Sequence, residues 1–490
     1  MDLDHPTNAD VAAVPLARSE QRPAAVSRRG FLAWSAAMTL AACADAAPTP
    51  RSILPTAAAP SPEATPRPAS GTPPSSPAPS VTSAPSTAPS RRRILIRDTA
   101  LAEGRNDRLQ VGISLFVENG TIAWIRPADD EGDPGPAEGL EIIDGNGATV
   151  VPGLVDCHSH VSMPGGGHWI DRAFDAPAEL VRAGEHNGRL MTRAGIRWAR
   201  DVGSPVGADP VDGRERGLAL GLRDRWAAAG GDLPYIRAAG TWLTRRGTLP
   251  AGLGVEAGNA DELLAAATRQ LDDGADLVKL YLDGPDADTS PWSTAEIRRV
   301  VDAVHGRGAK VTAHSGRLSG ARAGVAGGVD SLEHGFELDD DVARDMAARG
   351  TALVSTLTVM RSWQTFARTT TMQRFTGASG RAAIAARLER AEESVRIARA
   401  AGVAIAAGTD FGGGSGRANQ LAWEVESLVA AELEPWEALG AATWRGGELL
   451  GEPDAGVIRV GGPADIVLVH GDPTTDPTAL WRVWRVVWSD

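Results

Sequence analysis

Residues 150–160 read VVPGLVDCHSH, and this stretch decides the fold class. An apolar run of strand length ends there in two histidines, His158 and His160. Because side chains alternate across a strand, both imidazoles point to one side and Cys157 points to the other. We therefore interpret Cys157 as a small buried side chain and the two histidines as a candidate ligand pair.

Further apolar runs follow this stretch and alternate with helical stretches rich in Ala, Arg and Glu. The eight predicted strands are 150–160, 195–202, 234–242, 277–282, 310–314, 331–334, 352–357 and 403–409. The predicted helices include 262–274, 294–307, 340–349 and 382–401. Repeats of strand then helix favour an α/β fold, a (β/α)₈ TIM-type barrel, with a doubly wound open sheet as the alternative.

The two flanks of this barrel region carry a different pattern. Strand-like runs at 93–96, 113–117 and 121–125 include an Asn119-Gly120 turn, which is a strong hairpin signal. Similar apolar runs occur at 456–458, 464–469 and 484–488. We predict that residues 92–149 and 456–490 pair into one small β-sandwich domain, and that residues 150–455 form the barrel.

The first 42 residues have the features of an export signal. Residues 27–32 read SRRGFL and place a twin arginine before the apolar run 31–42, which is too short to span a bilayer and is typical of a signal peptide. The run ends in LAAC at 40–43, which resembles the lipobox of bacterial lipoproteins. The resemblance implies export through the twin-arginine machinery. It also implies a lipid anchor on Cys43 at the outer face of a bacterial membrane, periplasmic or extracellular.

Residues 43–91 form a spacer in this interpretation. The segment is dominated by Pro, Ala, Ser and Thr, a composition that builds no core and predicts a disordered, extended tether. The net charge is −13, and residues 1–93 together carry +3, so the remaining body carries −16. An acidic body without a basic stripe argues against a nucleic-acid partner.

More polar side chains stand at the ends of later predicted strands. His314 ends the fifth, His334 ends the sixth, and Asp410 follows the eighth. Barrels place their chemistry at the C-terminal ends of the strands, and four of the nine histidines in the chain occupy such positions. Imidazole nitrogens with a carboxylate suit a divalent metal, most readily Zn²⁺, while Mn²⁺, Co²⁺ or Fe²⁺ fit the same donors.

Lysine is nearly absent from this chain, which has 49 basic residues but only two lysines, Lys279 and Lys310. Lys279 ends the fourth predicted strand among the candidate ligands, where a cation beside a metal is repelled. Its neutral amine can add CO₂ to form a carbamate with two oxygens able to bridge two metals, a reaction that arginine cannot provide. Lys310 starts the fifth predicted strand without such a role, so the scarcity of lysine alone does not show that a remaining lysine is functional.

Taken together, these segments resemble the amidohydrolase superfamily over about residues 92–490. The matching segments are PGLVD at 152–156, HSH at 158–160, VK at 278–279, TAH at 312–314, EHG at 333–335, GTD at 408–410 and GPADIV at 462–467. Their order is similar to that of binuclear members in the imidazolonepropionase-like and Xaa-Pro dipeptidase-like branch. The resemblance implies two divalent metal ions joined by a carboxylated Lys279. The ligands would be His158, His160 and Asp410 for one ion, and His314 and His334 for the other.

The resemblance also implies an activity. It is hydrolysis of an amide, peptide or cyclic amide C–N bond in a small molecule or short peptide by a metal-bridging hydroxide, with Asp410 as general base and then general acid. Tyr281 lies two residues beyond Lys279 on the same strand face and is a candidate donor to the developing oxyanion. The alternatives are hydrolysis of an ester or lactone at the same site, or a lipid-anchored solute-binding protein. Candidate substrate-binding residues are Arg246, Arg361 and His168.

Overall fold

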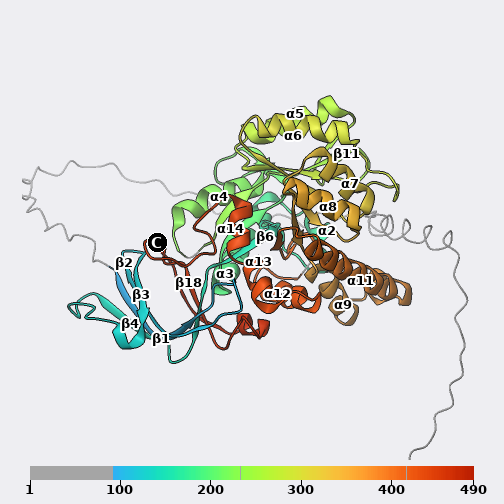
Figure 1. Ribbon diagram of the computed structural model, residues 1–490. Coiled ribbons are helices and arrows are strands. Elements are labelled where there is room, and N and C mark those ends of the chain that lie inside the picture. Colours follow the sequence, from blue (N-terminus) through green and yellow to red (C-terminus); the bar gives the residue numbers. More distant parts are fainter. Residues whose placement is uncertain (1–91, 232, 415) are drawn as a thin grey trace, which may run out of the picture.

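The computed structural model describes residues 92–490 except Asp232 and Ser415. The predicted signal peptide, the tether and Cys43 lie outside the described residues. Figure 1 shows a β-sheet at one end of the molecule and a larger α/β body beside it. Within the described part of the chain, no helix combines the length and the apolar composition needed to cross a membrane.

The small β part is a seven-stranded mixed sheet in the order β19-β18-β5-β1-β2-β3, with β4 paired to β1. Its strands are β1 Arg93–Leu101, β2 Gln110–Glu118, β3 Thr121–Pro127, β4 Leu140–Asp144, β5 Thr149–Pro152, β18 Ile466–Val469 and β19 Val483–Val487. The β2–β3 hairpin turns at Asn119 and Gly120, whose φ angles are 51° and 76°. The antiparallel pairing of β5 with β18 brings the two ends of the described chain into one sheet, through residues 149–152, which were predicted to lie at the start of the barrel. That this sheet folds into a sandwich stays a prediction.

The α/β body contains two sheets of parallel strands, one ordered β10-β7-β6 and one ordered β12-β11-β13-β14-β15-β16-β17. The strands are β6 Leu154–Ser159, β7 Ile196–Asp201, β10 Tyr235–Ala238, β11 Trp242–Arg245, β12 Val255–Ala257, β13 Leu277–Tyr281, β14 Lys310–Ser315, β15 Ser331–His334, β16 Ala352–Ser355 and β17 Ile405–Ala407. A separate hairpin pairs β8 Val206–Ala208 with β9 Glu215–Gly217.

Backbone hydrogen bonds join the two parallel sheets at both seams. The amide of His160 donates to the carbonyl of Phe411 over 3.0 Å, and the amide of Asp276 donates to the carbonyl of Ala238 over 2.9 Å. This arrangement fits a TIM-type barrel. Among the residues described, strand pairing does not run continuously around the ring, so full closure of a (β/α)₈ barrel stays a prediction.

Helices cover the parallel sheets (Figure 1). The α-helices are α2 Trp169–Arg172, α3 Pro177–Arg193, α4 Leu218–Ala229, α5 Ala260–Asp272, α6 Thr294–His305, α7 Leu318–Gly327, α8 Asp340–Arg349, α9 Thr358–Thr369, α10 Gln373–Thr376, α11 Ala378–Ala400, α12 Leu421–Ala430, α13 Pro435–Ala441 and α14 Trp444–Leu450. Short 3₁₀ helices are η1 Ala128–Asp130 and η2 Pro477–Trp481. Helix α6 illustrates how the α-helices pack against the sheets, because its apolar residues recur at helical spacing and form one buried face. These residues are Ile297, Val300, Val301 and Val304.

Two of the predicted strands are divided in the structure. The predicted strand 150–160 breaks at Gly153 into β5, which joins the small sheet, and β6, which joins the parallel sheet. A side chain at Gly153 would place its Cβ 2.8 Å from the Cβ of Arg197, so only glycine fits this passage between sheets. The predicted strand 234–242 likewise divides into β10 and β11.

Candidate active site

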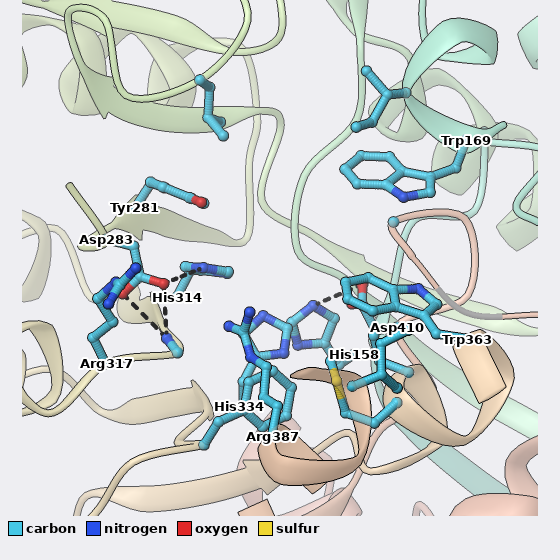
Figure 2. A pocket seen from close by; sticks show the side chains of 18 of the residues that line it. His158, Trp169, Tyr281, Asp283, His314, Arg317, His334, Trp363, Arg387 and Asp410 are labelled. Atoms are coloured by element: carbon cyan, nitrogen blue, oxygen red, sulfur yellow. Dashed lines mark hydrogen bonds and ion pairs between the residues drawn. The ribbon is translucent and has the colours of Figure 1, made fainter. Parts of the chain in front are cut away.

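The predicted metal-site residues meet in one cavity at the C-terminal ends of the parallel strands. The cavity has a volume of about 520 Å³, and Figure 2 shows several of its side chains pointing toward one another. Because these strands are parallel, residues distant in sequence reach the same rim. The candidate ligands on its wall are His158, His160, Lys279, His314, His334 and Asp410.

His158, His160 and Asp410 form the tightest group, with their ligand atoms all within 4.8 Å of one another. Oδ1 of Asp410 lies 3.0 Å from Nε2 of His160 and 3.4 Å from Nε2 of His158. Burial raises the pKa of Asp410, but the contacts of its carboxylate with His158 and His160 outweigh burial and hold this pKa well below its ordinary value. The carboxylate is therefore ionised, and two nitrogens and an oxygen converge as divalent-metal ligands do.

Partners on the outer nitrogens fix the orientation of both rings. Nδ1 of His160 donates to the carbonyl of Gly203 over 2.7 Å, and Nδ1 of His158 lies 2.6 Å from Oε2 of Glu333. A carbonyl or carboxylate on one ring nitrogen leaves the other nitrogen free to ligate a metal. In both rings the Nε2 atom faces Asp410. The pair is thus held in the tautomer and the direction that a ligand needs.

Glu333 is the centre of a buried ion-pair network that the sequence interpretation missed. Its Oε1 accepts from Nη2 of Arg200 over 2.6 Å and from the hydroxyl of Ser331 over 2.9 Å. The charge of Arg200 and the hydrogen bond with His158 hold the pKa of Glu333 well below its ordinary value, against the effect of burial. A charged residue inside a predicted barrel strand was the available signal, and it applies to both Glu333 and Arg200.

The turn that presents Asp410 is held in a strained backbone conformation. Asp410 has a φ of 51°, in the left-handed region, and its amide donates to the carbonyl of His158 over 2.7 Å. The buried carboxylate of Asp156 in β6 accepts from the Thr409 hydroxyl over 2.7 Å and from the Thr409 amide over 3.0 Å. Burial raises the pKa of Asp156 to about 7. These contacts tie the turn after β17 to β6 and so place Asp410 against the histidines.

His314 and His334 lie beside this group. The centroid of the His334 ring is 4.5 Å from that of His314 and 4.7 Å from that of His158. Nδ1 of His334 bonds to the hydroxyl of Thr356 over 2.8 Å, and Nε2 of His314 bonds to Asp283 over 3.1 Å. Burial lowers the pKa of both imidazoles, and that of His334 falls well below its ordinary value. Both rings are therefore neutral and keep the lone pair that a metal ligand requires.

Lys279 lies among these ligands with its side chain 1% exposed. In the described part of the chain, no group forms a hydrogen bond with its Nζ. A buried amine without a partner is costly, and burial lowers the pKa of Lys279 to about 8. Lys310 is different, because its exposed amine donates to the carbonyl of Leu449 over 2.6 Å. The orphaned Nζ of Lys279 fits a group that completes its contacts inside the cavity.

The structure brings Tyr281 to the cavity but leaves the three predicted substrate-binding residues off its wall. The ring of Tyr281 stacks on His314 with 4.1 Å between centroids. Arg246 forms an ion pair with Glu262 at 3.6 Å, and Arg361 forms one with Glu392 at 2.9 Å. The side chain of His168 is exposed beside Asp171, so none of the three predicted residues lines the cavity. Different arginines line the cavity, namely Arg317, Arg387 and Arg390.

A family model, sequence relatives and solved structures each match most of this chain. The family model described as "Amidohydrolase family" matches residues 149–488. An uncharacterized protein of Mycobacterium tuberculosis is 32% identical over 394 residues, covering 78% of this chain and 95% of the relative. The ochratoxinase of Aspergillus niger is 26% identical over 378 residues, covering 69% of this chain and 74% of the relative. A solved Xaa-Pro dipeptidase has the same fold, with a TM-score of 0.67 and 24% identity over 81% of this chain and 98% of that one.

The parallel sheets fit a TIM-type barrel, and the histidine–carboxylate group at their C-terminal edge could hold a metal ion, an arrangement typical of metal-dependent enzymes. The chain belongs to the amidohydrolase family. It is an enzyme, a hydrolase that acts on carbon–nitrogen bonds. Members of this superfamily depend on metal, and the buried group of His158, His160 and Asp410 is present here.

Proposed function

We propose that this protein is a metal-dependent hydrolase of amide-type C–N bonds in small molecules or short peptides. The observation that carries the proposal is the convergence of His158, His160 and Asp410 beside the orphaned amine of Lys279. The names of two similar proteins, an ochratoxinase and an Xaa-Pro dipeptidase, add support for an amide bond. The cavity of about 520 Å³ lies in the range that holds small ligands.

The donors fit two divalent ions, with Zn²⁺ as the first choice. His158, His160 and Asp410 would hold one, His314 and His334 the other, and a carboxylated Lys279 would join them. Carboxylation would explain why Nζ of Lys279 has no hydrogen-bond partner, because it would convert this buried amine into a group with two oxygen ligands. When bound, such ions act as Lewis acids and lower the pKa of a shared water toward about 7.

The chain's own residues position the substrate and move the proton. The ionised Asp410 accepts a proton from the attacking water at its carboxylate and donates it to the leaving nitrogen. Glu333 and the carbonyl of Gly203 hold the His158 and His160 rings in place. The hydroxyl of Tyr281 donates a hydrogen bond to the substrate carbonyl oxygen as negative charge develops there.

Removing metal from the purified protein is expected to abolish hydrolysis, because bound divalent metal would supply the Lewis-acid chemistry that the reaction needs. The test is dialysis against a chelator, assay on a panel of dipeptides and aryl amides, and then re-addition of Zn²⁺, which should restore the rate. Circular dichroism before and after controls for unfolding. If metal analysis shows that the protein is metal-free and its activity is nevertheless complete, the proposal is contradicted.

We also propose that the protein is exported through its twin arginine, Arg28 and Arg29, and anchored to the membrane by lipid on Cys43. The support is the sequence order of arginine pair, apolar run and LAAC segment. Cys43→Ser is expected to move the protein from the detergent-extracted membrane fraction to the soluble fraction, since the variant has no thiol to acylate. A distribution that does not change would show that Cys43 is not the anchor.

A further inference from the structure

A run of three glycines at 412–414, the glycine segment, follows the candidate ligand Asp410 after one residue. The chain runs against His160 there, because the carbonyl of Phe411 accepts a hydrogen bond from the His160 amide over 3.0 Å. Gly413, the middle residue of the segment, also lines the cavity. The glycine segment is therefore the part of the cavity wall that lies beside two candidate ligands, His160 and Asp410.

Gly413 has no room for a side chain. A Cβ at this position would lie 2.2 Å from Cδ2 and 2.5 Å from Nε2 of His160, and 2.6 Å from Oδ1 of Asp410. The last two atoms are candidate ligand atoms, and they lie 3.0 Å apart. The φ of Gly413 is outside the left-handed range that favours glycine. The position therefore requires glycine for space and not for backbone freedom.

The imidazole of His160 is fixed on its other sides and cannot turn away from the glycine segment. Its Nδ1 donates to the carbonyl of Gly203 over 2.7 Å. The buried carboxylate of Asp201 accepts from the amide of Gly203 over 3.0 Å and from the amide of Val161 over 2.7 Å. The ring of Trp242 lies 5.1 Å from the imidazole. An added methyl group could move the imidazole only by breaking these contacts.

The glycine segment and the carboxylate are fixed as well. The indole of Trp363 in α9 donates to the carbonyl of Gly414 over 2.6 Å, and Figure 2 shows Trp363 beside Asp410. The amide of Asp410 donates to the carbonyl of His158 over 2.7 Å. Neither the segment nor the carboxylate is thus free to retreat from an added methyl group.

We propose that Gly413 is a positioning residue of the candidate metal site. Its lack of a side chain lets Nε2 of His160 and Oδ1 of Asp410 approach each other, as two ligands of one ion must. A larger residue would separate these two atoms, so that they would no longer converge with His158. The inference rests on the proposed function, because it concerns the metal that this function requires.

The test measures metal binding by the metal-free full chain. Gly413→Ala is expected to weaken the binding of one Zn²⁺ ion in calorimetry by about 10–100-fold, the loss typical when the contacts that orient metal ligands are removed. The visible absorption of added Co²⁺, which reports the geometry of its ligands, should change as well. Gly284→Ala is the matched control, because a Cβ there would meet Pro291 at ordinary contact distances of 3.5 and 3.7 Å. This control should bind both ions as the wild type does.

A double variant tests the physical cause. Metal-free Gly413→Ala should melt below the metal-free wild type, because the methyl group overpacks the site. Two of the three shortest contacts of this methyl group are with the ring of His160. In a His160→Ala background, adding Gly413→Ala should therefore lower the melting temperature much less. An equal effect in both backgrounds overturns the proposal. If Gly413→Ala alone does not fold, the double variant is expected to fold, and its failure to fold overturns the proposal too.

The outcomes separate this inference from the proposed function. Zn²⁺ binding by Gly413→Ala that is as tight as in the wild type overturns the role of Gly413 and leaves amide hydrolysis intact. Weaker binding by this variant, with a wild type that binds Zn²⁺ but cleaves no amide, supports the role of Gly413 and contradicts amide hydrolysis. A wild type that takes up neither Zn²⁺ nor Co²⁺ contradicts both.

Discussion

Asp410→Asn is expected to lower kcat/KM by about 10³-fold or more, because asparagine keeps the shape of the side chain but cannot hold the transferred proton. General acid–base catalysis contributes about 10²–10⁴-fold, and here the same carboxylate also faces both imidazoles at 3.0 and 3.4 Å. The substitution therefore removes the proposed proton carrier and a candidate metal ligand together. Steady-state kinetics with metal analysis of the same preparation measures both losses.

Two further variants serve as comparisons for the loss of rate in Asp410→Asn. Asp454→Asn removes an exposed carboxylate that pairs with Arg459 far from the cavity wall, and we expect no change in rate. Tyr281→Phe removes the hydroxyl that we propose donates to the developing oxyanion, and the expected loss is about 10²-fold. An Asp410→Asn enzyme that holds its full metal content and retains more than about a tenth of the rate would show that the proton passes through another group.

The candidate ligands could be predicted from two patterns, the alternation of side chains along a strand and the position of barrel chemistry at the C-terminal ends of the strands. Residues such as His158, His314 and Asp410 each stand at or just after the end of a predicted strand, so a local pattern is enough to bring them to one rim. The partners behind them depend on long-range packing. Arg200 and Glu333, for example, are separated by 133 residues, and no local pattern pairs them.

The features that the sequence did not predict also depend on long-range packing. Residues 150–160 look like one strand because both halves are apolar, and the change of sheet at Gly153 depends on β18, which lies far along the chain. Arg246 and Arg361 follow predicted strands, but their long side chains pair with Glu262 and Glu392 on neighbouring helices. Arg387 was one of many arginines on a helix, and its direction became apparent only in the folded chain.

Lys279→Arg is expected to lower the metal content from about two ions per chain to one or fewer, and kcat/KM by about 10²-fold or more. Arginine keeps a buried positive charge among His158, His314 and His334 but cannot add CO₂, so the proposed bridging oxygens could not form. Lys310→Arg is the control, because it changes the other lysine of the chain, whose amine is exposed and donates to the carbonyl of Leu449. That variant should bind metal and turn over substrate as the wild type does.

A second substitution separates the bridging role from a role in folding. Lys279→Met replaces an amine that lacks a partner with an apolar side chain, so the metal-free variant is expected to melt no lower than the metal-free wild type. Intact-mass measurement under CO₂ should show one added CO₂ on the wild type and none on either Lys279 variant. Full metal content and an unchanged rate in Lys279→Arg would contradict the bridge. A much lower melting temperature for metal-free Lys279→Met would instead assign the lysine to the packing of the strands.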